Sequence, residues 1–143
     1  MSKKRASTRQ KQAVIERAHR CCEYCRSQMR YATQTFSIEH LFPEQLGGKT
    51  TLDNLALSCQ GCNNHKFTKT TAVDPVSREI VPLYHPRKQR WHDHFAWTQN
   101  FTVVLGLTPT GRATVQALHL NREGLLNIRQ LLFEKGVHPP KES

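Results

Sequence analysis

The chain has 143 residues, 37% of them hydrophobic, which suits one domain or a small domain with an appendage. Lys and Arg number 21 against 11 Asp and Glu, and the formal net charge of +10 favours a polyanionic partner, usually nucleic acid, over an anionic membrane surface. No stretch approaches the roughly 20 apolar residues of a membrane span, and the polar, basic start differs from a signal peptide, so we expect a cytoplasmic protein.

The first half of the chain predicts a helix, two short strands and a second helix. Residues 1–7 are basic and polar and predict a disordered tail, while Ser7 and Gln10 can form a capping box for a helix over residues 8–20. The next predicted elements are a strand over 36–41, an exposed loop over 44–51 containing Gly47-Gly48, a second strand over 52–57 carrying Asn54, and a short helix over 63–70.

The second half predicts a mixed extension that starts near residue 85. Pro75, Pro82 and Pro86 predict irregular structure over 73–90. Beyond it we expect a hairpin over 95–107, a helix near 112–119 capped by Thr110 or Thr114, and an amphipathic helix over 123–135 that ends at Gly136 and packs Leu125, Ile128, Leu131 and Leu132 on the protein's own core. Arg112, Arg122 and Arg129 are expected on helix surfaces.

Four cysteines form two knuckles, Cys22-x-x-Cys25 and Cys59-x-x-Cys62. Two such turns can supply four thiolates to one tetrahedral Zn²⁺, and a site with four protein ligands is structural because it keeps no open position. Cys21 has the wrong spacing and is expected to be a buried thiol that does not bind the metal. The alternatives are a thioredoxin-like redox pair, which does not explain two knuckles, and an unmetallated cluster.

Glu39 and His40 lie between the knuckles and offer groups that suit hydrolysis of a phosphodiester. A carboxylate is a hard ligand for Mg²⁺ or Mn²⁺. A neutral imidazole, with an ordinary pKa of ~6.5, can take a proton from water. A single Glu-His pair has little specificity, and the alternatives are an exposed glutamate and a histidine that is hydrogen-bonded to a backbone carbonyl.

A wider set of residues around this pair resembles the HNH endonuclease family, in its subgroup with two Cys-x-x-Cys knuckles. Asn54 follows His40 by 14 positions and Asn63 follows Asn54 by 9, as in the family's His, Asn and His/Asn positions. The resemblance covers roughly residues 10–70 and implies a ββα-metal fold. The residues that match are Cys22-Glu23-Tyr24-Cys25, Ile38-Glu39-His40-Leu41-Phe42-Pro43, Gly47-Gly48-Lys49-Thr50-Thr51-Leu52-Asp53-Asn54-Leu55 and Cys59-Gln60-Gly61-Cys62-Asn63-Asn64-His65-Lys66.

The resemblance also implies a role for individual residues. His40 matches the general base that activates water, and Asn54 matches the asparagine that ties the loop between the strands and orients that base. Glu39 and Asn63 match the ligands of a catalytic Mg²⁺ or Mn²⁺, with His65 as an alternative or additional ligand. Lys66 matches a basic helix residue that contacts phosphate.

Basic residues elsewhere extend the predicted nucleic-acid surface. Arg87, Lys88 and Arg90 cluster beside Trp91, and such a cluster can track a phosphate backbone while the indole stacks on a base. The alternative is a solvated loop with Trp91 in the core. Together with Lys49 and Lys66, the three cluster residues are the predicted nucleic-acid contacts.

These observations predict an α+β protein with a zinc-stapled ββα-metal core, an N-terminal helix and a mixed α/β C-terminal extension. The expected organisation is a disordered tail over 1–7, a nuclease core with structural zinc over 8–84, and an extension over 85–143 that packs on the core. The expected function is metal-dependent hydrolysis of duplex DNA to 5′-phosphate and 3′-hydroxyl ends by a monomer or homodimer. A zinc-stabilised nucleic-acid binding module without catalysis is the main alternative, and a redox or zinc-storage protein is a third.

Overall fold

The computed structural model describes residues 5–141 of the chain. The first four residues of the predicted disordered tail therefore lie outside the described residues. Within the described part, the tail leads directly into helix α1, and Ala6 packs against the hydrophobic core. Among residues 5–141 no helix is both long and apolar enough to cross a bilayer.

Helix α1 (Thr8–Arg17) begins with the predicted capping box. The Ser7 hydroxyl accepts a hydrogen bond from the Gln10 amide, and the Gln10 side chain accepts one from the Ser7 amide. The helix ends three residues earlier than predicted because His19 and Arg20 adopt left-handed backbone conformations, with φ of 53° and 59°. Its Val14 side chain is fully buried.

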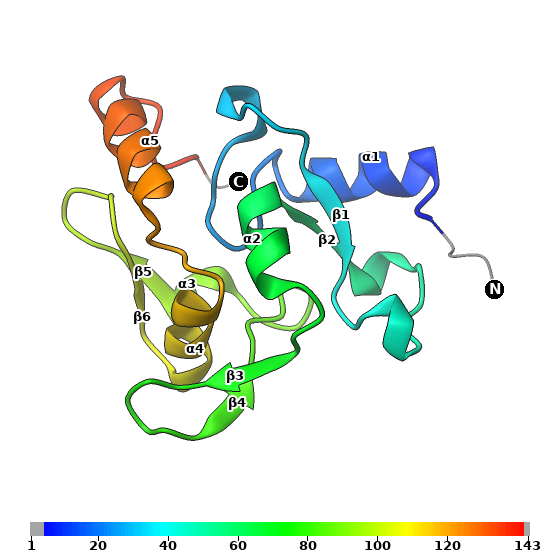
Figure 1. The fold of residues 1–143 in the computed structure, drawn as a ribbon. Helices are drawn as coiled ribbons and strands as arrows, with labels where there is room; N and C mark the ends of the chain where they lie inside the picture. The colour runs from blue at the N-terminus through cyan, green and yellow to red at the C-terminus, as the bar shows by residue number, and fades with distance from the viewer. Residues whose placement is uncertain (1–4, 142–143) are drawn as a thin grey trace.

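The centre of the fold is an antiparallel hairpin with one helix packed against it. Strand β1 (Ser37–His40) pairs with β2 (Leu55–Ser58) in a register that places His40 opposite Leu55. The second strand starts later than predicted, because Leu52–Asn54 forms a 3₁₀ turn that leaves Asn54 immediately before the strand. Helix α2 (Gln60–Lys66) packs against β1, as Figure 1 shows. This ββα arrangement confirms the predicted core fold.

Helix α2 starts three residues earlier than predicted. Cys59 is its N-cap, and the Cys59 sulfur accepts a hydrogen bond from the amide of Cys62 at 3.5 Å. The second cysteine knuckle is therefore also the first turn of the helix, which fixes the helix relative to any metal that the cysteines bind.

A second hairpin occupies the region that was predicted to be irregular. Strand β3 (Thr71–Val73) pairs with β4 (Ile80–Pro82), so the prediction for residues 73–90 is wrong over 73–82. Pro82 is the last residue of a strand in a two-stranded sheet, where its missing N–H is tolerated. The turn is built on Asp74, whose carboxylate accepts hydrogen bonds from the amides of Val76 and Ser77.

The Asp74 carboxylate also joins this hairpin to the C-terminal half. Arg112, on helix α4 (Pro109–Ala117), donates two parallel hydrogen bonds of 2.9 Å to it. Arg112 is therefore a partner of a buried carboxylate and not the free surface residue that was predicted. The hydrogen bonds from Arg112 hold the pKa of Asp74 well below its ordinary value.

We expect the contribution of Asp74 to stability to depend on pH. An acid whose pKa is lowered by folding stabilises the native state above its unfolded pKa of ~3.9 and loses that contribution as pH falls towards its folded pKa. The difference in unfolding free energy between the wild type and Asp74→Asn should therefore be largest at pH 7 and shrink below about pH 4. Urea unfolding at pH 7, 4 and 3 measures it, with Glu134→Gln as control, and a difference that does not change with pH contradicts the expectation.

The remaining elements follow the predicted order with corrected boundaries. The hairpin predicted over 95–107 is confirmed, and helix α4 is capped by Thr108, neither by Thr110 nor by Thr114. The last helix, α5, is followed by Gly136 at a φ of 75°, as predicted. The chain also forms the 3₁₀ turns Met29–Tyr31 and Glu44–Leu46, helix α3 (Trp91–His94), strands β5 (Phe95–Trp97) and β6 (Val104–Gly106), and helix α5 (Glu123–Glu134).

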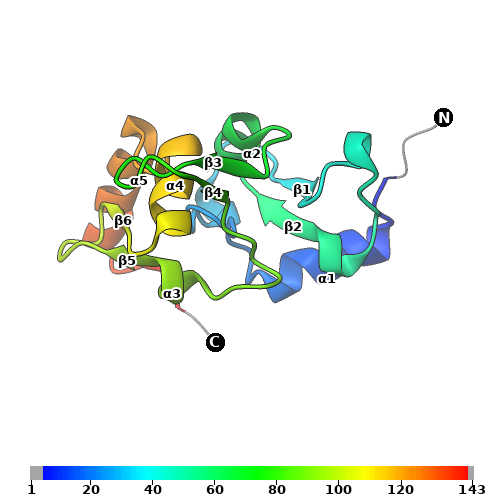
Figure 2. The ribbon, with the colours of Figure 1, turned by 90° about the horizontal axis from the view of Figure 1, so that it is seen from below.

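Both halves of the chain contribute to one hydrophobic core. Val14 of α1 and Leu57 of β2 belong to the same buried cluster as Phe95, Leu118 and Leu125 from the extension. Figure 2 shows β3 and β4 lying between the α4–α5 side and the β1–β2 side of the molecule.

Candidate active site and zinc centre

The four knuckle cysteines converge at one point. Their sulfur atoms all lie within 4.8 Å of one another and all four residues are buried. Cys25 Sγ and Cys59 Sγ are 3.6 Å apart, close to the edge of about 3.8 Å that a tetrahedron with Zn–S bonds of about 2.3 Å requires. Four thiols at this spacing fit a structural zinc ion. Cys21 is buried outside the group, with its sulfur 3.3 Å from the carbonyl of His19.

Backbone geometry explains why the sequence brings these sulfurs together. The Cys22 amide donates to the carbonyl of Ser27, and the Arg26 amide donates to the carbonyl of Cys22, so the first knuckle is a tight turn. Arg26 closes this turn with a left-handed φ of 65°. Hydrogen bonds from Cys22 and the other cysteines lower the pKa of Cys59, which favours the thiolate that a metal binds.

Glu39 and His40 point to opposite faces of β1, as neighbours on a strand must. Glu39 is 7% exposed and faces the core, where the Tyr24 hydroxyl donates a 2.8 Å hydrogen bond to its Oε1. Lys66 Nζ, from α2, lies 3.2 Å from the same oxygen. Burial raises the pKa of Glu39 and outweighs the opposing effect of Lys66.

Lys66 is a buried cation with unused hydrogen-bonding capacity. Its side chain is 3% exposed, and its ammonium makes no well-aligned hydrogen bond to the described residues besides its ion pair with Glu39. An ammonium carries three hydrogen-bond donors, and burying a donor without an acceptor lowers the stability of the fold. The Glu39 carboxylate, 3.2 Å away, meets the charge of this ammonium inside the protein.

His40 and Asn54 are joined through the loop that connects β1 to β2. His40 Nε2 lies 2.9 Å from Thr50 Oγ1 in this loop. Asn54 accepts a 2.8 Å hydrogen bond from the Phe42 amide and donates to the carbonyls of Phe42 and Lys49. Asn54 thus holds both ends of the loop.

Close backbone packing in the same loop requires a glycine. A Cβ on Gly48 would lie 1.8 Å from the carbonyl oxygen of Phe42. The Gly48 amide instead donates to the carbonyl of Pro43 at 2.9 Å. Gly48 therefore lets the loop fold back on the end of β1, close to His40.

Asn63 and Glu39 lie on facing surfaces of α2 and β1. Asn63 Nδ2 is 3.5 Å from Ser37 Oγ, and Ser37 shares a strand face with Glu39. Tyr24 and Lys66 both contact Glu39 Oε1, and carboxylate and amide oxygens are the ligand types that Mg²⁺ and Mn²⁺ prefer. The His65 ring packs against that of His119, with 4.3 Å between the ring centroids, and burial lowers the pKa of His65.

A cleft of about 470 Å³ is lined by Asn54 and Lys66 of the predicted site but not by Glu39, His40 or Asn63. We call it the lysine cleft because three lysines line it, one from the β1–β2 loop, one from α2 and one from the extension. Thr51 and Asp53 of the loop line it as well. The residues that define the lysine cleft here are Lys49, Lys66, Lys88, Asn54 and His85.

Residues 22–77 match the family described as HNH endonuclease. We call residues 22–77 the HNH segment. The HNH segment begins at the first knuckle and runs through β1, β2, α2 and β3 into the β3–β4 turn. No curated protein and no solved structure matches the chain. The four-cysteine zinc-binding cluster and the family match together support the predicted type of core.

Only part of the predicted basic cluster faces the cleft of the HNH segment. Lys88 lines it, whereas the Arg87 guanidinium forms an ion pair with Glu23. Arg90 lies at the start of α3 and lines a different hollow. Trp91 is a core residue, 2% exposed, and its indole N–H donates to the carbonyl of Tyr24 at 2.9 Å.

His85 is the cleft residue that the sequence analysis missed. It follows the HNH segment and belongs to no motif, so only the fold reveals that it lies beside Lys66 and Lys88 in the cleft wall. Burial and the nearby Lys88 lower the pKa of His85, which favours its neutral form near pH 7.

Proposed function

We propose that the protein is a divalent-metal-dependent DNA endonuclease that hydrolyses phosphodiesters to 5′-phosphate and 3′-hydroxyl ends. The observation that supports this most is a cleft lined by Lys49, Lys66 and Lys88, in and next to an HNH segment. Ammonium groups along a cleft favour the phosphates of a nucleic-acid backbone. The formal net charge of +10 agrees with a nucleic-acid substrate.

In this proposal the lysine cleft binds the backbone of the substrate. Lys49 and Lys88, which line it, contact phosphates of the backbone, and the buried Lys66 adds positive charge behind the cleft wall. When bound, a Mg²⁺ or Mn²⁺ held by Glu39 and Asn63 supplies charge neutralisation at the phosphate. Asn54 keeps the β1–β2 loop closed, so that His40 and Lys49 hold fixed positions relative to each other.

His40 acts as the general base. If its Nε2 donates to Thr50 Oγ1, which lies 2.9 Å away, then Nδ1 carries the free lone pair that accepts a proton. His40 takes the proton from a water whose oxygen attacks phosphorus, and the bond to the 3′ oxygen breaks. That oxygen takes a proton from solvent and leaves as the 3′ hydroxyl, while the phosphate stays on the 5′ end.

We also propose an oligomeric state and a cellular compartment for the protein. One active centre per chain cuts one strand, so a monomer nicks duplex DNA, and cutting both strands takes a homodimer or two visits. Thiolate ligands persist in a reducing compartment, so we propose that the protein acts in the cytoplasm.

The test follows conversion of supercoiled plasmid to nicked and linear forms in Mg²⁺, Mn²⁺ or EDTA. We expect conversion with metal and none in EDTA. A Lys49→Ala/Lys88→Ala variant, purified in parallel, should convert plasmid more slowly and bind duplex DNA with a shallower salt dependence because two phosphate contacts are lost. Conversion in EDTA at the rate seen with metal, or equal conversion by the variant, contradicts the proposal.

A second candidate function is a zinc-stabilised module that binds nucleic acid without cutting it. The observation that favours it is the environment of Glu39, whose charge is already met by Lys66 and Tyr24. This alternative predicts DNA binding that depends on Lys49 and Lys88, with no plasmid conversion in any metal.

A further inference from the structure

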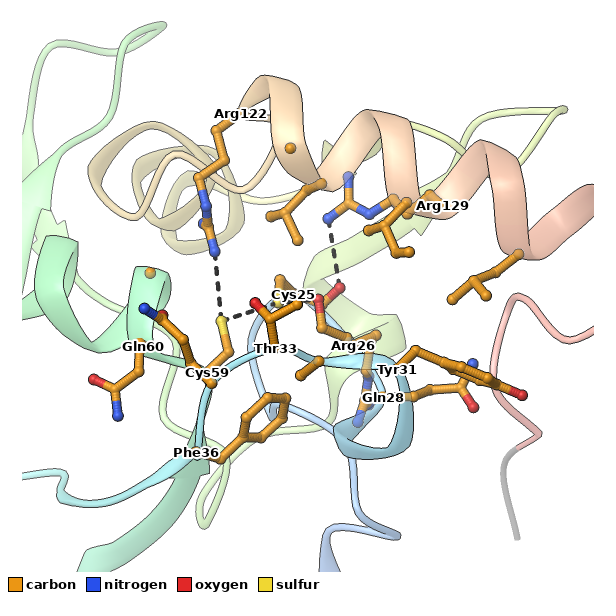
Figure 3. A pocket seen from close by; sticks show the side chains of 18 of the residues that line it. Cys25, Arg26, Gln28, Tyr31, Thr33, Phe36, Cys59, Gln60, Arg122 and Arg129 are labelled. Atoms are coloured by element: carbon orange, nitrogen blue, oxygen red, sulfur yellow. Dashed lines mark hydrogen bonds between the residues drawn. The ribbon is translucent and has the colours of Figure 1, made fainter.

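A guanidinium from the C-terminal half lies against the sulfurs of the zinc-binding cluster. Arg122 is the N-cap residue of α5. Its Nη2 lies 3.4 Å from Cys59 Sγ and its Nη1 lies 3.6 Å from Cys62 Sγ, within range of N–H···S hydrogen bonds. Figure 3 shows Arg122 reaching down from the start of the helix to Cys59. The second knuckle therefore has a cationic hydrogen-bond donor beside two of its sulfurs.

The position of this guanidinium is fixed by its own segment of the chain. Arg122 Nη1 also donates to the backbone carbonyls of Leu118 and His119, at 3.3 and 3.2 Å. A guanidinium stays protonated in proteins, so Arg122 presents a positive charge to the two sulfurs. The guanidinium is already held by two backbone carbonyls, so it loses little conformational entropy when it hydrogen-bonds a metal-bound thiolate.

Gly61, inside the second knuckle, makes room for Arg122. A Cβ at Gly61 would lie 2.3 Å from Arg122 Nη2 and 2.7 Å from its Cζ. Gly61 lies within α2, and glycine is a poor helix former. Its presence there is accounted for by the close approach of the guanidinium.

A second arginine, which is buried, contacts the first knuckle. Arg129 of α5 is 3% exposed, and its Nη2 donates to the carbonyls of Leu120 at 2.7 Å and Cys25 at 3.4 Å. Zinc bound by four thiolates carries a net charge of −2, and the guanidiniums of Arg122 and Arg129 balance it. Both are supplied by the extension.

We propose that Arg122 is an outer-sphere residue of the zinc centre. Its guanidinium, admitted by Gly61, hydrogen-bonds the Cys59 and Cys62 thiolates, shields them from protons and electrophiles, and slows release of the metal. Partners of metal ligands commonly change affinity about 10- to 100-fold. The inference rests on zinc occupying the four-cysteine site and is independent of nuclease activity.

The test measures zinc release from the full-length, zinc-loaded protein to excess 4-(2-pyridylazo)resorcinol. We expect Arg122→Gln to release zinc at least about 10-fold faster than the wild type, and Arg122→Lys to fall between them. Gly61→Ala should also release zinc faster because it displaces the guanidinium. The double variant Gly61→Ala/Arg122→Gln should be no faster than Arg122→Gln, since both changes remove the same contact.

Gly124→Ala is the matched glycine control, because a Cβ at that position meets nothing within 4 Å, and its release rate should equal that of the wild type. Circular dichroism checks that each variant is folded before release is measured. If Arg122→Gln does not fold, the zinc release rate of Gly61→Ala, compared with that of the wild type, tests the inference. Wild-type release rates in folded Arg122→Gln and Gly61→Ala overturn the inference, as does additivity in the double variant.

Discussion

The substitution His40→Ala should lower the rate of plasmid cleavage about 100- to 10,000-fold, the range typical of losing a general base. The variant keeps the zinc site and the lysine cleft, because His40 belongs to neither. Its hydrogen bond to Thr50 is lost, but Asn54 still holds both ends of the loop. Cleavage should therefore fall while zinc content, circular dichroism and duplex binding stay at wild-type levels.

The matched control is His92→Ala. His92 is exposed and lines a different hollow from the lysine cleft. Single-turnover cleavage is the appropriate measurement because it separates chemistry from product release. Equal conversion of plasmid by wild type and His40→Ala removes the assignment of the base. Loss of both binding and cleavage in the variant would instead show that His40 supports the cleft.

Removal of zinc should unfold the protein. Structural zinc sites contribute apparent free energies of about 10–16 kcal/mol, comparable with or larger than the net stability of about 5–15 kcal/mol of a typical domain. Here the four thiols lie inside the single hydrophobic core, with Cys22 and Cys62 fully buried. Without the metal, the two knuckles are no longer cross-linked. Arg122 and Arg129 also lose the negative charge of the zinc–thiolate centre that balances their own.

Metal analysis should give one zinc per chain, and a strong chelator or the Cys59→Ser substitution should abolish the cooperative thermal transition seen by circular dichroism. Cys21→Ser is the control, since Cys21 lies outside the four-sulfur group and its loss should leave zinc content unchanged. An apo protein with an undiminished melting temperature would show that the core is stable without the metal.

The local features of this fold were accessible from sequence because short-range chemistry determines them. The capping box at Ser7 and the two knuckles depend on residues a few positions apart. The ββα core followed from the resemblance to the HNH family, which also pointed to the loop tie made by Asn54. The predicted roles of His40, Glu39 and Asn63 in catalysis stay predictions.

Features that depend on distant partners were not predictable. The periodicity of α5 predicted that Leu131 is buried and Arg129 exposed, but Leu131 is 49% exposed and Arg129 is buried. Backbone carbonyls provide partners for Arg129, and one of them, that of Cys25 in the first knuckle, is 104 residues away in the sequence. Likewise, Pro82 suggested irregular structure because sequence alone does not show that its strand ends at that position.

The shared core limits how this protein can be divided. Leu118, Leu120 and Leu125 fill the same interior as the residues of β2, and Arg122 and Arg129 supply counter-charge to the knuckles. A fragment cut after residue 84 would expose that interior to water and leave a buried dianion uncompensated. The two halves are therefore not interchangeable modules, and recombination that grafts the HNH segment onto another protein must transplant the carboxyl-terminal helices as well.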